Sequence, residues 1–223
     1  MKRTKLKDRI LPSYRHGEDI FNMVSHIVGG AFGIAYLVLA VIFSALHRDP
    51  WAVVSSAIYG ASTVFLFTMS SVYHGVRPIM ARRVLQVIDH CTIYFMIAGT
   101  YTPFTLCVLR RASAPLGWTI FGIIWGFAAL AITLNAIDLK RYQRFSMICY
   151  LGMGWCIVFT LKPLLETIGA AGGALLFGGG VLYTVGAVLY GIGKRRPYAH
   201  ALFHVFVVLG SLAHFFCIFF YVI

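Results

Sequence analysis

Long apolar runs separated by short polar connections dominate this chain of 223 residues. Because a helix needs about 20 apolar residues to cross roughly 30 Å of hydrocarbon, each run is long enough for one membrane span. The connections leave no room for a separate soluble domain. The pattern predicts an all-α integral membrane protein, with a basic segment over residues 1–20 and a transmembrane bundle over residues 21–223. Its seven spans are expected at approximately 21–46, 51–73, 84–109, 116–137, 145–161, 171–192 and 200–223.

Lysine and arginine are distributed unevenly between alternate connections. Of the 19 basic residues, all but four fall in the N-terminal segment and in the second, fourth and sixth loops. Cytoplasmic loops of membrane proteins carry the excess of Lys and Arg. The distribution therefore predicts a cytoplasmic N-terminus and an outside C-terminus, which an odd number of spans requires, in a multi-pass protein of the cell (inner) membrane.

Composition also indicates a membrane protein and argues against a soluble protein that binds nucleic acid. Hydrophobic residues make up 60% of the chain and charged residues 12%, which is far from the balance of a soluble domain. A net charge of +12 would suggest nucleic-acid binding in a soluble chain, but here the basic residues flank apolar runs, so we expect no nucleic-acid partner. The five cysteines lie in apolar segments without a C-x-x-C pair, which favours buried thiols over disulfides.

Four ionisable side chains interrupt the apolar runs at similar predicted depths. His74 closes the second run, Asp89 lies in the third, and His200 and His204 open the seventh. With the predicted topology and a rise of about 1.5 Å per residue, all four fall within the inner-leaflet third of the membrane. Ionisable groups are costly there, so their convergence indicates a functional site.

The residue types at this depth suggest a metal site. His200 and His204 share a helix face through their i, i+4 spacing, and His74 offers a third imidazole. Three histidines with an open fourth position form the ligand set of a catalytic zinc site, so we predict Zn²⁺ and no other cofactor. Asp89 is the candidate general base, and Ser70, one turn before His74, is suited to an oxyanion hydrogen bond.

Other histidines leave alternatives open. For His90, a packing role or a simple hydrogen bond is as plausible as a functional role. His26 shares a face with Asn22 and Glu18, which makes this face either a set of partners for the metal ligands or a polar stripe at the interface. His214 lies about 15 Å beyond His204 along the predicted helix, so we expect it to make a structural hydrogen bond.

Two Gly-x-x-x-Gly pairs bear on helix packing. Gly29 with Gly33, and Gly122 with Gly126, suit either close packing within the bundle, which we favour, or faces of a dimer. The sequence does not determine the oligomeric state.

Together the motifs resemble those of the haemolysin III family, the bacterial branch of the progestin and adipoQ receptor superfamily. The resemblance covers essentially the whole chain. It rests on Glu18-x-x-x-Asn22-x-x-Ser25-His26, Ser70-Ser71-x-Tyr73-His74, Asp89-His90 and His200-x-x-x-His204. It implies a seven-helix fold with an inside N-terminus, a zinc ion held by His74, His200 and His204, and a water near Asp89. It also implies kinship with alkaline ceramidases, zinc amidases that cleave a lipid amide within the membrane.

Three functions are compatible with these observations. The first is a zinc-dependent intramembrane hydrolase that cleaves an amide or ester of a membrane lipid and so influences lipid homeostasis; whether the chain is an enzyme stays open. The second is a non-enzymatic sensor or regulator in which a structural zinc site holds the helices together and a lipid is the ligand. The third, a haemolytic pore, is disfavoured because no charged pore-lining stripe is present.

Overall fold

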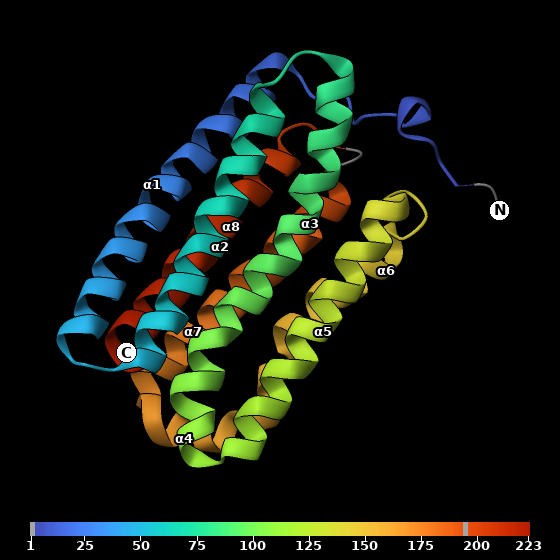
Figure 1. The fold of residues 1–223 in the computed structure, drawn as a ribbon. Coiled ribbons are helices and arrows are strands. Elements are labelled where there is room, and N and C mark those ends of the chain that lie inside the picture. Colours follow the sequence, from blue (N-terminus) through green and yellow to red (C-terminus); the bar gives the residue numbers. More distant parts are fainter. Residues whose placement is uncertain (1–2, 194–195) are drawn as a thin grey trace.

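The computed structural model describes residues 3–193 and 196–223, which fold as a bundle of long helices (Figure 1). The long elements are α1 (His16–Leu46), α2 (Pro50–Gly75), α3 (Ile79–Pro103), α5 (Ala114–Asp138), α6 (Gln143–Trp155), α7 (Leu161–Ile192) and α8 (Ala199–Tyr221). Short elements connect or precede them, namely η1 (Leu6–Asp8), η2 (Phe104–Leu109), α4 (Arg110–Ala112) and η3 (Cys156–Thr160). These two ranges contain no strand, which confirms the all-α prediction.

Six helical stretches of the described chain are long and apolar enough to cross a membrane. The sequence predicted seven because it separated the runs 145–161 and 171–192, whereas the structure is helical from Gln143 to Ile192 apart from a kink at Gly169. Gly169 has φ 65° and ψ −173°, a conformation that glycine adopts readily and other residues avoid. The seven-span count and the sidedness of the termini therefore remain predictions. Three basic residues used for that sidedness, Lys2, Lys194 and Arg195, lie outside the described residues.

The outside of the bundle is apolar and much of its interior is polar or small. On α1, the exposed large side chains include Ile27, Phe32, Val38 and Ile42. The buried positions of the same helix are Glu18, Asn22, His26, Gly29, Gly33, Tyr36, Ala40 and Ser44. A surface of this kind is compatible with lipid rather than water as the surrounding solvent. The chain is a multi-pass membrane protein whose helices turn polar faces toward one another.

Helix α3 continues through a proline into a wider turn. Pro103 lacks the N–H that would bond one turn back, and the chain passes directly into the π-helix η2. The hydroxyls of Thr102 and Thr105 donate to the carbonyls of Ala98 and Tyr101, at 2.9 and 3.0 Å. These bonds supply donors to backbone carbonyls in a region without bulk water, and the helical path is kept.

Glycines set the closest contact between α1 and α2. A Cβ placed on Gly60 would lie 2.7 Å from the Cβ and 2.9 Å from the Cα of Leu37, so the two backbones leave no room for a side chain. A Cβ on Gly29 would lie 2.7 Å from the ring of Phe67, and one on Gly33 would lie 3.2 Å from Thr63. The pair Gly29 and Gly33 thus packs inside the bundle, as expected.

The second glycine pair is different. A Cβ placed on Gly122 or Gly126 of α5 would have no atom of the described chain within 4 Å. Close packing within the bundle, the interpretation favoured from sequence, is therefore wrong for this pair. Periodicity identified a small-residue face but did not reveal which way that face points.

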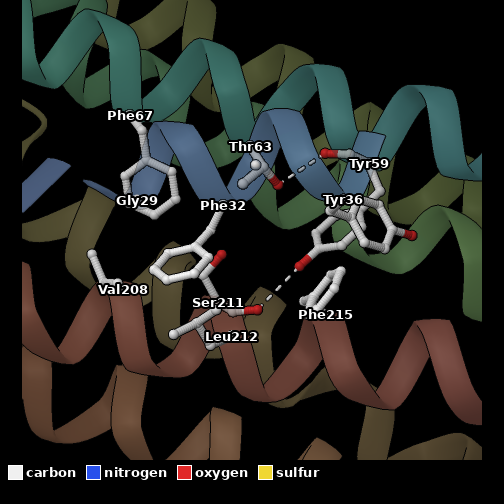
Figure 2. A pocket seen from close by; sticks show the side chains of 11 residues that line it. Gly29, Phe32, Tyr36, Tyr59, Thr63, Phe67, Val208, Ser211, Leu212 and Phe215 are labelled. Atoms are coloured by element: carbon white, nitrogen blue, oxygen red, sulfur yellow. Dashed lines mark hydrogen bonds between the residues drawn. The ribbon is translucent and has the colours of Figure 1, made fainter. Parts of the chain in front are cut away.

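Helices α1, α2 and α8 pack together around a small gap (Figure 2). The hydroxyl of Tyr59 on α2 donates to the carbonyl of Ser211 on α8 at 3.3 Å, and the hydroxyl of Thr63 donates to the carbonyl of Tyr59 at 2.9 Å. The gap that remains among these side chains and Phe215 is only about 10 Å³, too small to hold more than one water. These side chains therefore form a packed contact rather than a binding site, and the contact holds α8 in register against α1 and α2.

The Gly60 contact yields a stability prediction. Gly60→Ala should lower the free energy of unfolding by about 1–3 kcal/mol, because the added methyl meets backbone atoms that cannot rotate away. Gly126→Ala is the matched control, since its methyl would enter open space. Thermal unfolding of both variants in detergent measures the difference. Equal unfolding temperatures for the two variants would mean that α1 and α2 can move apart at Gly60 without loss of stability, which would contradict the tight contact described above.

Candidate metal centre

Three buried histidines meet where α2 ends and α8 begins, at the upper end of the bundle in Figure 1. His74 is the next-to-last residue of α2, and His200 and His204 occupy the first turns of α8. The exposed fractions of these residues are 4%, 8% and 2%. The convergence predicted from depth alone is thus confirmed for the three proposed ligands.

The spacing of the ring nitrogens suits a shared cation. One nitrogen from each ring lies within 4.8 Å of the others, and Nε2 of His204 is 3.1 Å from Nε2 of His200. Two imidazole ligands of a tetrahedral zinc ion, each about 2.0 Å from the metal, have nitrogens roughly 3.3 Å apart. Nε2 of His74 is buried and has no hydrogen-bond partner within the described ranges. The group can hold a metal ion.

A carboxylate fixes the orientation of the His74 ring. Nδ1 of His74 donates to Oδ1 of Asp19 on α1 at 2.9 Å, and Asn22 approaches the same nitrogen at 3.4 Å. Arg82 on α3 donates to both oxygens of Asp19, at 2.6 and 2.7 Å. Because Nδ1 carries the proton, the lone pair of His74 is on Nε2, which is the nitrogen a metal would bind.

The first turn of α1 also positions the start of α8. Tyr198, which precedes α8, has φ 59°, and its backbone N–H donates to Oε1 of Glu18 at 2.6 Å. Oε2 of Glu18 accepts from the backbone of Arg15 at 2.9 Å, in the geometry of a capping box. Glu18 thereby ties the beginning of α1 to the turn that delivers His200 and His204.

His26 belongs to the same cluster. Its ring centroid lies 3.9 Å from that of His204 and 5.0 Å from that of Phe67. Both of its ring nitrogens are buried and lack a hydrogen-bond partner in the described chain. With Asn22 beside His74 and Glu18 at α8, the polar face of α1 lies against the three candidate ligands. Of the two sequence interpretations, partners of the ligands rather than an interfacial stripe, the structure favours the first.

A cavity of about 170 Å³ opens beside the histidines. Asp89 and Ser70 line it together with His200 and His204, whereas His74 is not among its lining residues. Most other lining side chains are apolar or aromatic, among them Leu66, Ile93, Met96, Ile97, Leu151, Phe203 and Val207. Asp89 is partly buried and lies 3.7 Å from the ring of its neighbour His90. The cavity combines a polar end with an apolar body, as the site of an amphiphilic ligand requires.

Tyr14 covers the cluster from the N-terminal segment. Its ring stacks on His200 with a centroid separation of 4.7 Å and lies 5.5 Å from His74. Burial raises the pKa of Tyr14, so its hydroxyl keeps its proton at neutral pH. The segment before it is fastened across the bundle, because the backbone of Thr4 donates to Asp138 at 2.8 Å and Arg83 donates to the backbone of Arg9 at 2.9 Å.

Three sets of residues remain to be placed: His90, His214 and the five cysteines. His90 has both ring nitrogens engaged, with the carbonyl of Gln86 at 2.8 Å and the hydroxyl of Tyr190 at 3.1 Å, which favours its structural interpretation. His214 makes the structural hydrogen bond expected of it, to the carbonyl of Leu176 at 3.0 Å. All five cysteines are free thiols; Cys107 and Cys217 are buried as predicted, whereas Cys91, Cys149 and Cys156 are half-buried.

Sequence reasoning missed Asp19, Arg82 and Tyr14. Acidic residues are common in the first turn of a helix, where they satisfy its free N–H groups, so Asp19 gave no signal distinct from an ordinary helix start. Arg82 was counted only as a determinant of topology. Tyr14 lies in a polar segment whose path over the bundle depends on long-range contacts.

Known proteins place these features in one family. Residues 14–215 match the family described as Haemolysin-III related. The chain is 38% identical to "Hemolysin-3" of Bacillus cereus over 206 residues, which covers 92% of each chain, and 40% identical to "Hemolysin-3 homolog" of Bacillus subtilis (strain 168), over 92% of this chain and 94% of the relative. It is also 30% identical to human "Monocyte to macrophage differentiation factor", over 92% of this chain and 83% of that protein. With the family matched over most of its length, and relatives aligned nearly end to end, the chain belongs to the haemolysin III family.

Proposed function

We propose that this protein is a zinc-dependent hydrolase that cleaves an amide or ester of a membrane lipid. The observation that carries the proposal is the cavity: its lining includes His200 and His204 of the three-histidine cluster together with Asp89 and Ser70, and most of its other side chains are apolar or aromatic. A lipid reaching this cavity would place its polar linkage at the histidines and its chain among apolar side chains.

The donor set supports zinc as the metal. Three imidazoles with no thiolate leave one tetrahedral position open, which is the arrangement of catalytic rather than structural zinc sites. A bound zinc ion would supply Lewis acidity and lower the pKa of a coordinated water toward neutrality. Asp19 would hold His74 in the tautomer that binds through Nε2, as carboxylate partners of histidine ligands do in other zinc sites.

Side chains of the protein supply proton transfer, stabilisation of the developing negative charge, and binding of the lipid. Asp89 accepts the proton of the attacking water at a carboxylate oxygen and passes it to the leaving amine or alkoxide. Ser70 donates its hydroxyl to the carbonyl oxygen on which negative charge develops. Tyr14, stacked over His200, restricts access of bulk water to the histidines. The apolar lining binds and orients the lipid chain.

A second candidate, a regulator with a structural metal site, has its own support. Helices α2 and α8 both pack against α1, and they approach each other chiefly through side chains. A metal held by His74, His200 and His204 would join these two helices directly. The two proposals differ at Asp89, which a structural site does not require.

Metal analysis and turnover together test the hydrolase. Wild-type protein purified in detergent should contain stoichiometric zinc and release fatty acid from at least one member of a panel of ceramides and phospholipids. Asp89→Asn should keep its zinc but lose turnover by at least about 100-fold, because only the proton acceptor is removed. His204→Ala should lose zinc. Glu166→Gln and His47→Ala, at exposed positions, are the matched controls and should behave as wild type.

Two results would contradict this proposal. Stoichiometric zinc without turnover on any lipid would favour the structural site, as would full cellular function in Asp89→Asn together with loss of function in His204→Ala. Absence of metal from the wild-type protein would remove both candidates.

The role of Asp19 gives a separate prediction. Asp19→Asn should weaken zinc binding about 10- to 100-fold, because the amide cannot hold the His74 tautomer or neutralise Arg82 as the carboxylate does. Competition with a chromophoric chelator measures the affinity, and Asp8→Asn, an exposed acid in the N-terminal segment, is the control. If both variants bound zinc as tightly as wild type, the orienting role would be excluded.

We further propose seven spans in a cell (inner) membrane, with residues 1–20 and the N-terminus in the cytoplasm. Two observations support this: the interruption at Gly169 allows the stretch from Gln143 to Ile192 to form two spans, and basic residues cluster on alternate connections. In this topology the metal ligands lie near the cytoplasmic face.

Thiol labelling tests this topology. In a cysteine-free background, Ser113→Cys should react with a membrane-impermeant maleimide in intact cells, whereas Lys140→Cys should react only after permeabilisation. Both side chains are exposed, so accessibility depends on the side of the membrane alone. The reverse pattern would invert the orientation, and labelling of both from outside would exclude a span between them.

A further inference from the structure

The cavity beside the histidines extends far along α8 and reaches a second polar group. Its lining includes His214, ten residues after His204 and therefore roughly 15 Å further along the helix axis. A smaller cavity of about 30 Å³ adjoins this end, and the two share His214, Thr100, Tyr101 and Gly154. A lipid chain leaving the histidines would thus meet His214 at the distal end.

The His214 ring is held in one orientation and one tautomer. Its Nε2 lies 3.0 Å from the carbonyl oxygen of Leu176, which can only accept, so Nε2 carries the proton. The other nitrogen, Nδ1, is then an acceptor, and it is buried without a donor in the described part of the chain. Gly179 makes room for this ring, since a Cβ there would lie 2.3 Å from Cδ2 of His214.

Tyr183 supplies the complementary group. Its ring centroid lies 5.4 Å from that of His214, and it lines the same cavity. Its hydroxyl is buried and has no hydrogen-bond partner among residues 3–193 and 196–223. An unsatisfied buried donor or acceptor costs about 1–3 kcal/mol, so an acceptor and a donor left open at one end of a cavity indicate a missing polar partner.

We propose that His214 and Tyr183 form a distal subsite that binds a hydroxyl group on the chain of the lipid, while the lipid's cleavable linkage lies at the histidine cluster. A hydroxyl donates to Nδ1 of His214 and accepts from Tyr183, which satisfies both groups with one oxygen. A carboxylate fits less well, because no Lys or Arg is among the described residues that line this cavity. The inference rests on the proposed function for the placement of the linkage, and it names the substrate class as lipids with a hydroxylated acyl chain.

Binding of fatty acids tests the subsite without requiring turnover. Titration calorimetry of the zinc-loaded protein in detergent would compare unsubstituted long-chain acids with acids of equal length that carry one hydroxyl, at a series of positions along the chain. One hydroxylated acid should bind about tenfold more tightly than its unsubstituted counterpart. His214→Gln keeps an N–H for Leu176 but loses the Nδ1 acceptor, and Tyr183→Phe loses only the hydroxyl. Each should abolish the preference, so that within each variant the hydroxylated and the unsubstituted acid have the same Kd.

Matched controls lie outside the cavity. Tyr221→Phe and His47→Gln, both exposed, should keep the preference. Equal affinity of wild type for every acid pair would overturn the proposal and indicate that a water fills the subsite, as would equal losses for both acids in the two subsite variants. Hydrolysis of unsubstituted lipids without any hydroxyl preference would keep the hydrolase and exclude the subsite. A hydroxyl preference without hydrolysis of any lipid would keep the subsite and exclude the hydrolase.

Discussion

Three imidazole rings buried against one another in an apolar bundle impose the constraint on which the site depends, because their ring nitrogens have to be satisfied away from water. The surrounding chain meets part of that requirement with specific polar contacts. Asp19 and Arg82 fix one ring, and Glu18 fixes the turn before the other two. The first helix contributes none of the three candidate ligands, yet its polar face organises all of them.

The fold class and three of the site residues followed from the sequence because each depends on local periodicity. Apolar runs predict helices, and the i, i+4 pair with a histidine at matched depth predicts a cluster. Asp19 and Tyr14 escaped prediction because their roles arise from contacts between segments more than 50 residues apart, as between Asp19 and His74. Hydropathy also divided the chain between Gln143 and Ile192 without showing that helical structure continues there, interrupted at Gly169.

The two glycine pairs also show that sequence spacing predicts a local feature but not its long-range contacts. Two Gly-x-x-x-Gly pairs have identical spacing, but Gly29 and Gly33 meet α2, whereas Gly122 and Gly126 meet no described residue. Spacing identifies a narrow helix face, and only the arrangement of neighbouring helices decides whether that face is filled. The polar groups of the cavity follow the same rule, since the surroundings of His214 are formed by Gly179 and Tyr183, which lie more than 30 residues away in the sequence.

The positions of the three histidines along the chain have a consequence for biosynthesis. His74 closes the second helix, while His200 and His204 open the last one, so the ribosome completes most of the protein before all the ligands exist. A partial chain that ends before the last helix would carry only one of the three candidate ligands, His74, next to Asp19. A metal bound by all three histidines would therefore be captured only after the last helix has been made, and its presence would report that this helix has been inserted beside α1.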